Sequence, residues 1–368
     1  MTDGDYMRLA LELAERGRGW TSPNPMVGAV VVKDGRIIGR GWHQRCGGPH
    51  AERAALAACT EDPRGGELYV TLEPCCHHGR QPPCTDAILA AGIRRVVVGS
   101  GDPNPLVAGK GIAALRERGV EVVEHMLGEE CSRLNEIFFH YIQTGRPFVI
   151  LKYAMTLDGK TAAYTGASKW ITGEEARRHV HGQRHRCAAI LVGVGTVLAD
   201  DPLLTCRLPG GKNPVRIICD SRLRTPLTAQ VVATAWETPT LLATCCADPE
   251  RRLAYERAGC RVVTAAGADG HVDLPQLMEQ LGREGLDSVL IEGGGALGWA
   301  ALDSGVVQRV QAYIAPKLLG GRDAKTPVEG RGVPDPSGAF QLGGATITRL
   351  GGDFLIEGEV IQRVHRDC

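Results

Sequence analysis

The sequence has no excess of either charge, because 42 lysines and arginines balance 42 aspartates and glutamates over 368 residues. A chain of zero net charge lacks the broad positive field that a long nucleic acid requires, so we expect no nucleic-acid partner. It also lacks any apolar run near the roughly 20 residues that cross a bilayer, so we expect no membrane association. Residues 1–6 are polar and acidic, which argues against a signal peptide.

The cysteines also lack the pattern of a disulfide scaffold. There are 13 of them, spread along the chain, and an odd number cannot all pair. Without a secretion signal, this usage predicts a cytoplasmic protein whose cysteines are free thiols or metal ligands. A homo-oligomer is compatible with all of these observations.

The length predicts two domains, because domains usually have roughly 100–200 residues. Apolar residues make up 43% of the chain and charged residues 23%, as in ordinary globular proteins. Gly145-Arg146-Pro147 is the expected boundary, since glycine and proline interrupt regular structure. We therefore expect one domain at 1–146 and a second at 147–368.

Each half alternates predicted strands and helices, which indicates the α/β class. In the first half we expect helices at 7–17, 50–59, 86–91, 111–118 and 129–144, and strands at 27–32, 67–72, 95–99 and 120–124, with a turn at 34–35 leading into 37–38. In the second half we expect strands at 148–155, 188–193, 215–220, 240–244, 261–264, 287–292 and 308–314, and helices at 174–186, 250–258, 274–284 and 295–304.

A candidate metal site begins at His50-Ala51-Glu52 and continues in Pro-Cys-Cys-His-His-Gly-Arg-Gln-Pro-Pro-Cys at 74–84. One histidine and two cysteines can hold zinc and leave its fourth position to water, whose pKa falls to about 7. A carboxylate that is not a ligand can then carry a proton to departing ammonia. The pattern matches the H-x-E and P-C-x-x-C signature of zinc deaminases, although eight residues separate the cysteines here. We interpret His50, Cys75 and Cys84 as ligands and Glu52 as the proton shuttle.

Two points about this site stay open. Cys76 is a rival ligand, and Cys75 is favoured because it directly follows a proline. Residues two apart on a regular helix point about 200° apart. His50 and Glu52 can therefore converge only at an irregular first turn or through the length of the glutamate side chain.

The second half carries a candidate nucleotide site where strand 287–292 runs into three glycines and a helix. Glycines let backbone N–H groups approach a diphosphate at a helix N-terminus, although such turns are often only tight connections. Lys152 lies in a predicted buried strand and needs an anionic or polar partner, unless that strand is an edge strand in water. The segment expected at the cofactor diphosphate comprises Gly294, Gly295, Ala296, Leu297, Gly298, Trp299 and Ala300.

Longer motifs occur in both halves. The first half contains T-S-P-N-P-M-V-G-A-V-V-V (21–32), G-W-H (41–43), P-H-A-E (49–52), T-L-E-P-C-C-H-H-G-R-Q-P-P-C (71–84) and D-P-N-P-L-V-A-G-K-G (102–111). The second contains L-K-Y-A-M-T-L-D-G-K (151–160), S-K-W-I-T (168–172), G-T-V-L-A-D-D-P-L-L-T-C-R (195–207), I-E-G-G-G (291–295) and A-P-K-L-L-G-G (315–321). Together they resemble the bifunctional deaminase/reductases of riboflavin biosynthesis over nearly the whole chain.

The resemblance implies a cytidine-deaminase-like α/β/α domain followed by a dihydrofolate-reductase-like α/β domain. The implied first reaction is hydrolytic deamination of 2,5-diamino-6-ribosylamino-4(3H)-pyrimidinone 5′-phosphate. The implied second reaction reduces the ribosyl chain with NADPH and gives 5-amino-6-ribitylamino-uracil 5′-phosphate. Zinc and NADPH are the implied cofactors, and a small pyrimidine nucleotide is the substrate.

The resemblance also implies roles for single residues. Lys152 and Asp200 would lie near the hydride-transfer centre, and Arg184 and Arg207 are the stronger candidates for the substrate phosphate because guanidinium forks match phosphate. The pyrimidine pocket would contain Asn24, His43, His77 and Arg80. The reductase substrate would contact Ser168, Arg184, Leu204, Arg207 and Glu292. NADPH would contact Ala154, Trp170, Thr172, Thr196, Asp200 and Ser221.

Two small departures and two rival functions remain. Gln81 stands where the family pattern leads us to expect threonine, and Gln308-Arg309 where it leads us to expect an acidic pair.

A nucleic-acid deaminase would share the zinc motif, but neutral charge and the long loop between the cysteines argue against it. A structural zinc site beside a nucleotide sensor would need four protein ligands and would not need the glutamate.

Overall fold

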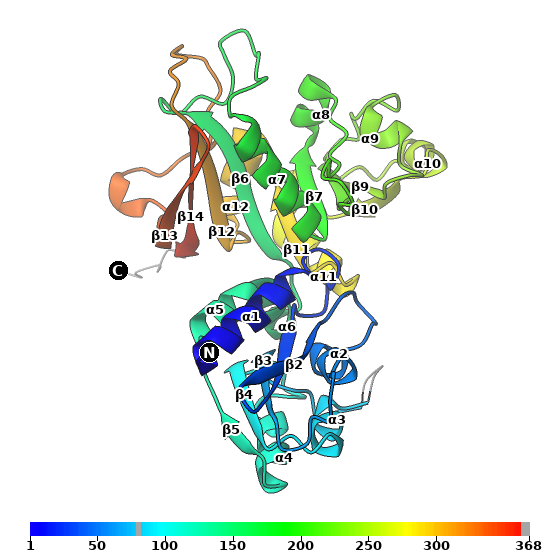
Figure 1. The fold of residues 1–368 in the computed structure, drawn as a ribbon. Helices are drawn as coiled ribbons and strands as arrows, with labels where there is room; N and C mark the ends of the chain where they lie inside the picture. Colours follow the sequence, from blue (N-terminus) through cyan, green and yellow to red (C-terminus); the bar gives the residue numbers. More distant parts are fainter. Residues whose placement is uncertain (79–81, 362–368) are drawn as a thin grey trace. The chain divides into compact units, whose positions relative to one another are not determined.

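The computed structural model describes residues 1–78 and 82–361. The chain divides into two compact units, Met1–Gly145 and Arg146–Cys368 (Figure 1). Two positions singled out in the sequence, Arg80 and Gln81, lie outside the described residues. In the described part, no helix combines the length and apolar character that crossing a membrane requires.

The first unit is built on a five-stranded sheet of order β2-β1-β3-β4-β5. β1 is antiparallel to both of its neighbours, whereas β3, β4 and β5 run parallel. The strands are β1 (Gly28–Lys33), β2 (Arg36–Trp42), β3 (Glu67–Leu72), β4 (Arg95–Ser100) and β5 (Glu121–Val123). The helices are α1 (Asp3–Glu15), α2 (Ala51–Ala57), α3 (Cys84–Ala90), α4 (Lys110–Glu117), α5 (Gly128–Leu134) and α6 (Glu136–Thr144).

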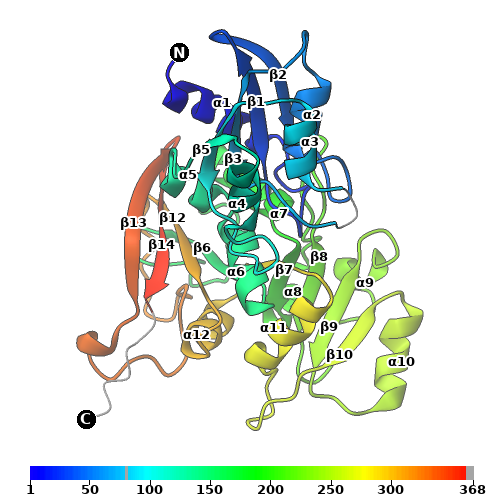
Figure 2. The same cartoon turned by 90° about the horizontal axis from the view of Figure 1, so that it is seen from below.

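Side-chain alternation along β1 produces three layers, because successive residues of a strand point to opposite faces. Val31 packs in one cluster with Ala55 of α2 and Ile88 of α3. Val30 packs in another with Met7 of α1. Figure 2 shows α1 on one side of these strands and α2 and α3 on the other. The unit has the expected α/β/α architecture.

The second unit contains a nine-stranded sheet of order β10-β9-β8-β7-β11-β6-β12-β14-β13. The seven strands from β10 to β12 run parallel, and β14 and β13 complete the sheet as an antiparallel hairpin. The strands are β6 (Phe148–Thr156), β7 (Ala189–Gly193), β8 (Val215–Cys219), β9 (Thr240–Thr244), β10 (Arg261–Thr264), β11 (Ser288–Ile291), β12 (Arg309–Ala315), β13 (Gln341–Leu350) and β14 (Asp353–Ile361).

Helices cover both faces of this sheet, as expected for a mainly parallel arrangement. Leu277 of α11 and Ala301 of α12 pack on one face, and Val197 of α8, Val232 of α9 and Tyr255 of α10 pack on the other. The helices are α7 (Glu174–Arg186), α8 (Val194–Asp200), α9 (Gln230–Ala233), α10 (Pro249–Arg257), α11 (Leu274–Arg283) and α12 (Gly295–Asp303), with a short 3-10 helix η1 (Pro336–Gly338).

Three features differ from the expected elements. The β13–β14 hairpin and the short helices α8 and α9 were not predicted, and the helix expected at 129–144 is two helices. The break occurs at Asn135, which is 2% exposed. Its side-chain oxygen accepts from the Met26 N–H (2.8 Å), and its amide nitrogen donates to the Met26 carbonyl (2.9 Å). The asparagine thus ties the junction to a distant segment, which helix periodicity does not reveal.

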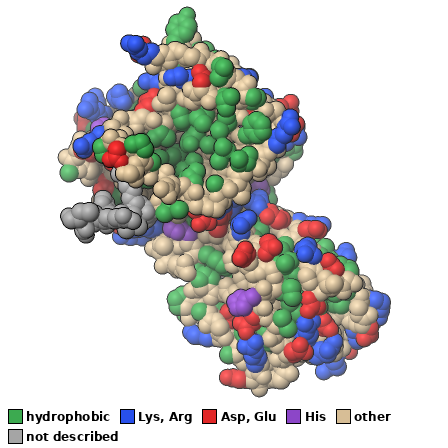
Figure 3. All heavy atoms as spheres, turned by 90° about the vertical axis from the view of Figure 1, so that its left-hand side faces the viewer, with side chains coloured by type: hydrophobic (Ala, Val, Ile, Leu, Met, Phe, Trp, Pro, Cys, Tyr) green, Lys and Arg blue, Asp and Glu red, His purple; other side chains and the backbone are tan. Residues whose placement is uncertain are grey.

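One face of the last strands is apolar and only partly covered. Met155 pairs with Ile314, Ile314 with Phe354, and Ile356 with Ile347, so these side chains share one face of the sheet. Ile347 is 71% exposed and Phe354 40%. Figure 3 views the second unit from the side of β13 and β14 and shows hydrophobic side chains gathered there. Apolar side chains gathered on an exposed face are a common feature of interaction surfaces.

Candidate functional site

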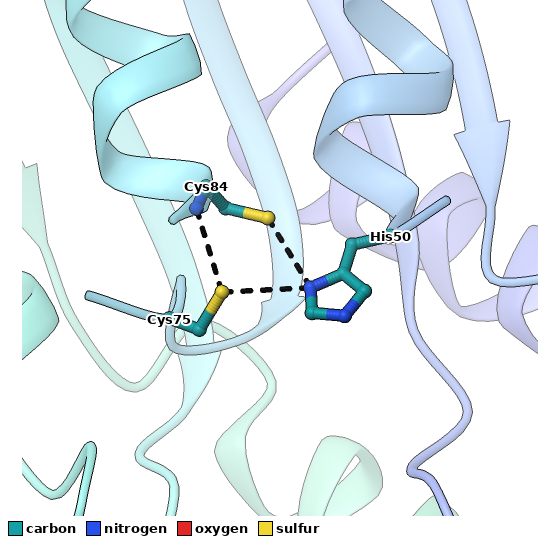
Figure 4. A group of neighbouring side chains, drawn as sticks. All are labelled: His50, Cys75 and Cys84. Atoms are coloured by element: carbon teal, nitrogen blue, oxygen red, sulfur yellow. Dashed lines mark hydrogen bonds between the residues drawn. The ribbon is translucent and has the colours of Figure 1, made fainter. Parts of the chain in front are cut away.

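The three residues interpreted as zinc ligands lie together in the first unit (Figure 4). The Nδ1 atom of His50 lies 3.5 Å from the Cys75 sulfur and 3.3 Å from the Cys84 sulfur. All three donor atoms lie within 4.8 Å of one another. Two thiols and one imidazole form a donor set that suits tetrahedral zinc, so these residues fit the ion.

Local structure explains how these side chains meet. His50 caps α2 with an extended backbone (φ −70°, ψ 158°), so it lies outside the helix that contains Glu52. Cys75 lies just beyond the end of β3, and Cys84 is the first residue of α3. The spacing of two residues therefore causes no conflict, because His50 precedes the helix and helical periodicity does not relate its direction to that of Glu52.

The Cys76 side chain lies apart from this group. Its sulfur lies 3.9 Å from the Leu106 carbonyl oxygen, and it is not among the three clustered donors. Within the described chain no fourth histidine, cysteine or carboxylate joins them. A zinc ion held by these three residues would keep a fourth position for water, whereas a purely structural zinc site would fill that position with a protein ligand.

Glu52 is 3% exposed and lines the same cavity as His50 and Cys75. Burial, with a further contribution from the negative charge of Cys75, raises the pKa of Glu52 to about 7. Hydrogen bonds with Cys84 and His50 lower the pKa of the Cys75 thiol to about 4. The site thus combines a thiolate suited to metal binding with a carboxyl group able to exchange protons near neutral pH.

A cavity of about 490 Å³ opens next to these residues. Asn24 and His43 line it and contact each other through Nδ2 and Nε2 (3.2 Å). The other ring nitrogen of His43, Nδ1, lies 2.9 Å from the Pro49 carbonyl and must donate to it. His43 Nε2 is then the acceptor, which turns the Asn24 amide nitrogen toward it and leaves the amide oxygen available to a ligand.

His77 also lines this cavity, and its buried Nδ1 atom has no hydrogen-bond partner among the described residues. An unpaired buried nitrogen at the wall of a cavity suits a polar ligand. Burial lowers the pKa of His43, so that ring stays neutral at physiological pH. Asn24, His43 and His77, which were expected to share a pocket, therefore line one cavity in the structure.

Two acidic residues of this site were not assigned from the sequence. Glu73 is 4% exposed, and its carboxylate accepts from the backbone N–H groups of Gly109 (3.0 Å), Gly111 (2.9 Å) and Ile112 (3.2 Å). It thereby holds the loop whose residue Asp102 lines the cavity. Burial raises the pKa of Asp102 to about 6. Glu73 lies in the motif at 71–84 and Asp102 in the motif at 102–111. The spacing of residues within these motifs did not predict a role for either side chain.

The second unit contains a buried charge cluster centred on Glu292. Its carboxylate accepts from Lys152 Nζ (3.2 Å) and from both Nε (2.7 Å) and Nη2 (3.1 Å) of Arg184. Burial alone would raise the pKa of Glu292, but the charges of Lys152 and Arg184 lower it well below its usual range. The structure thus identifies the anionic partner that the burial of Lys152 required.

This cluster lines a cavity of about 250 Å³. Arg184 directs two of its nitrogens to Glu292 and a third to the Thr205 carbonyl (3.0 Å), which leaves little of it for a phosphate. Arg207 is exposed and contacts His181 through Nε (3.1 Å), so it is the better-placed phosphate candidate. The expected residues that share this cavity are Lys152, Ala154, Ser168, Trp170, Thr172, Arg184, Arg207, Glu292, Gly294 and Gly295.

A larger cleft of about 870 Å³ adjoins the N-terminus of α12. A side chain at Gly294 would meet nothing within 4 Å, so this backbone is open to a ligand. A Cβ at Gly295 would lie 2.4 Å from Glu329 Cγ, and one at Gly298 would lie 2.9 Å from the Pro327 carbonyl oxygen. Gly295 and Gly298 therefore allow the 326–330 loop to pack closely against α12. The cleft contains the expected residues Ser221, Ala296, Leu297, Trp299 and Ala300.

Besides Gly298, which packs against the Pro327 carbonyl, three expected reductase residues do not line these cavities. The Leu204 side chain is 4% exposed and packs in the core with Ile218. Thr196 lies within α8, and Asp200 ends that helix with an exposed side chain. Neither is among the residues that line the two cavities.

Two family models match the chain. The "RibD C-terminal domain" matches residues 147–356, and the "Cytidine and deoxycytidylate deaminase zinc-binding region" matches residues 1–100. The riboflavin biosynthesis protein RibD of Actinobacillus pleuropneumoniae is 54% identical over 361 residues, covering 98% of this chain and 96% of the relative. The Escherichia coli K12 protein of the same name is 43% identical, covering 87% and 89%.

Solved structures agree over the full length. Acinetobacter baumannii RibD superposes with a TM-score of 0.86 at 36% identity, covering 98% of this chain and 99% of that chain. A diaminohydroxyphosphoribosylaminopyrimidine deaminase/5-amino-6-(5-phosphoribosylamino)uracil reductase from Thermotoga maritima superposes with a TM-score of 0.83 at 39% identity, covering 98% and 99%.

Proposed function

Because the chain belongs to the RibD family, the bifunctional deaminase/reductases of riboflavin biosynthesis, we propose which reaction each of its two parts catalyses and which residues take part. Enzymes of this family use zinc and NADPH. Residues 1–146 deaminate 2,5-diamino-6-ribosylamino-4(3H)-pyrimidinone 5′-phosphate. Residues 147–368 then reduce the ribosyl chain with NADPH, giving 5-amino-6-ribitylamino-uracil 5′-phosphate. The observation that carries this proposal is the clustering of His50, Cys75 and Cys84 beside Glu52 at one cavity.

In the deaminase, we assign His50, Cys75 and Cys84 to zinc binding. Zinc, when bound, supplies a Lewis acid that makes water more acidic at neutral pH. The Glu52 carboxylate takes one proton from the attacking water and delivers it to the ring nitrogen. It then takes the second proton, from the hydroxyl now bonded to the ring carbon, and passes it to the amine, which leaves as ammonia while the carbonyl forms. Asn24 and His43 orient the pyrimidine through the paired amide and imidazole, and His77 supplies a further polar contact.

In the reductase, Glu292 holds the Lys152 ammonium at the cavity wall beside the glycine turn. NADPH, when bound, supplies the hydride. The bond between C1′ and the ring oxygen breaks as C1′ is reduced, and the Lys152 ammonium can donate the proton that this oxygen gains. Arg207 pairs with the 5′-phosphate, because a guanidinium donates two parallel hydrogen bonds to a phosphate.

The test of the two reactions is a coupled assay on the purified chain. With the pyrimidine nucleotide, ammonia release should come first, and NADPH consumption should follow only after deamination. Release of ammonia from single-stranded DNA or RNA instead would favour the nucleic-acid deaminase. Absence of ammonia release from a zinc-loaded protein would favour a structural zinc site.

Zinc content gives an independent prediction. Protein purified without added metal should contain about one zinc per chain, measured by elemental analysis. Cys75→Ser should lose most of the zinc, because one of the three proposed ligands is removed. Cys76→Ser is the matched control and should keep the metal, since its sulfur faces the Leu106 carbonyl. A fully deaminating, metal-free protein would contradict the assignment.

We further propose that a second copy of the chain covers the apolar face formed by Met155, Ile314, Ile347, Phe354 and Ile356. A symmetric pairing would bury both copies of this face at once. Light scattering at micromolar concentration should give the mass of an oligomer, and Ile347→Arg should shift it to the monomer while the deaminase stays active. A monomeric unsubstituted protein would be inconsistent with this pairing.

A cytoplasmic location stays a prediction from the cysteine usage.

A further inference from the structure

A short loop after β8 presents two arginines to the large cleft. Asp220 is fully buried, and its carboxylate accepts from the Thr225 N–H (2.7 Å) and hydroxyl (2.8 Å). It also accepts weakly from the Arg222 N–H (3.4 Å). A buried aspartate that bonds residues two and five positions ahead closes a tight turn, so the backbone of this loop is fixed from within.

Core packing fixes the middle of the loop as well. Leu223 is 6% exposed and packs in the cluster that contains Val232 and Tyr255. The Tyr255 hydroxyl lies 3.1 Å from the Leu223 carbonyl and 2.6 Å from the Thr225 carbonyl. Because Leu223 points inward, its neighbours on either side, Arg222 and Arg224, are exposed and line the cleft.

The charges of these two arginines are not neutralised within the protein. In the part of the chain that the structure describes, neither guanidinium has an ion pair or a side-chain hydrogen bond. Acidic side chains do face the same cleft, but Asp273 caps α11 by accepting from the Gln276 N–H (2.9 Å), and Asp269 accepts from the His271 N–H (2.9 Å). Asp303 lines the cleft as well without pairing with either arginine.

The sheet order indicates which part of a dinucleotide would reach this loop. The strands run β8-β7-β11-β6, and ligands of parallel sheets bind at the carboxyl ends of the strands. Lys152 lies on β6, and the glycine turn that we assign to the diphosphate follows β11. A dinucleotide with its nicotinamide toward β6 and its diphosphate at β11 therefore extends its adenosine half across β7 to β8.

We propose that Arg222 and Arg224 bind the 2′-phosphate of the adenosine ribose and thereby select NADPH over NADH. This inference rests on the cofactor site proposed above. A 2′-phosphate carries up to two negative charges, and arginine is the side chain that pairs with it best. A carboxylate facing that ribose would instead accept from the free hydroxyls of NADH. Asp220, the carboxylate that directly follows β8, is fully buried and accepts from Thr225, so Arg222 and Arg224 are the charged residues that this loop presents to the cleft.

The test compares two fragments of the cofactor by calorimetry on the full chain. Adenosine 2′,5′-bisphosphate contains the 2′-phosphate, and 5′-AMP does not. Each single change, Arg222→Gln or Arg224→Gln, should weaken binding of the bisphosphate by about tenfold or more, because a hydrogen bond to a charged group is lost. Affinity for 5′-AMP should not change. Arg→Lys variants should keep part of the affinity, because they retain the charge.

Arg257→Gln is the matched control, since Arg257 is exposed at the end of α10 and does not line the cleft. Equal loss of both fragments in the glutamine variants, or no loss of either, would overturn the proposal. So would equal affinity of the unsubstituted protein for NADPH and NADH. If the unsubstituted protein bound neither dinucleotide, the proposed cofactor site itself would fail, which is a distinct result.

Discussion

Glu52→Gln is expected to lower the deamination rate by about 10²–10⁴-fold, the usual contribution of a general acid–base group. Glutamine is nearly isosteric and can still donate and accept hydrogen bonds, but it cannot carry a proton between water and an amine. Glu52 is buried and lines the cavity, yet it is not one of the three clustered donors. Zinc content should therefore stay near that of the unsubstituted protein.

The measurement combines zinc analysis, ammonia release and NADPH oxidation on one preparation of the variant. Reduction of supplied deaminated intermediate should continue, because the charge cluster of the reductase lies in the other unit. Glu117→Gln, an exposed change on α4, is the matched control and should leave both activities intact. Loss of zinc from Glu52→Gln, or normal ammonia release, would show that the role of Glu52 is misassigned.

The zinc group could be predicted from the sequence because its signals are local. His50 and Glu52 are neighbours, and prolines precede both cysteines. Apart from Cys76 as a rival ligand, the difficulty was the two-residue spacing of His50 and Glu52, which is unfavourable on a regular helix. The structure shows that His50 is a cap with extended backbone, so helical periodicity does not apply to it. His50 precedes the helix and Glu52 lies within it, an arrangement that neither of the two alternatives named.

Contacts that depend on the order of strands could not be predicted in the same way. The burial of Lys152 predicted an anionic partner, but Glu292 lies 140 residues away and meets it because β11 pairs with β6. Glu73 is a similar case: it binds a loop more than 30 residues ahead through backbone N–H groups. Backbone donors leave no mark in a side-chain motif, which is why this residue was overlooked.

The last hairpin was missed for a different reason. β13 contains Gly343-Gly344, and the strand shifts register between Gly343 and Thr346. Glycine weakens a strand signal and often marks a bulge. Much of β13 is also exposed, so the alternation of apolar and polar residues that marks a half-buried strand is weak there. The parallel strands of the core are buried on both faces and read as continuous apolar runs, so they were predicted correctly.

Lys152→Ala is expected to lower the rate of NADPH-dependent reduction by at least about 10²-fold, in line with the loss of one preorganised donor in an active site. The ammonium lies at the cavity wall, 3.2 Å from Glu292 Oε2. Alanine removes the donor without leaving the carboxylate unpaired, since Arg184 still binds Glu292 through two nitrogens. The second unit should therefore stay folded, and the effect should appear in the rate of reduction.

Deamination on the same preparation is the internal control, because His50, Glu52, Cys75 and Cys84 all lie in the first unit. Lys152→Arg tests whether charge alone suffices: it should keep the pairing with Glu292 but recover only part of the rate, since a guanidinium places its donors differently from an ammonium. A Glu292→Gln variant should have a lower melting temperature than Lys152→Ala, because it leaves the two buried cations Lys152 and Arg184 without a counter-charge. Loss of both activities in Lys152→Ala would refute the division between residues 1–146 and 147–368, and unchanged reduction would refute the role of Lys152.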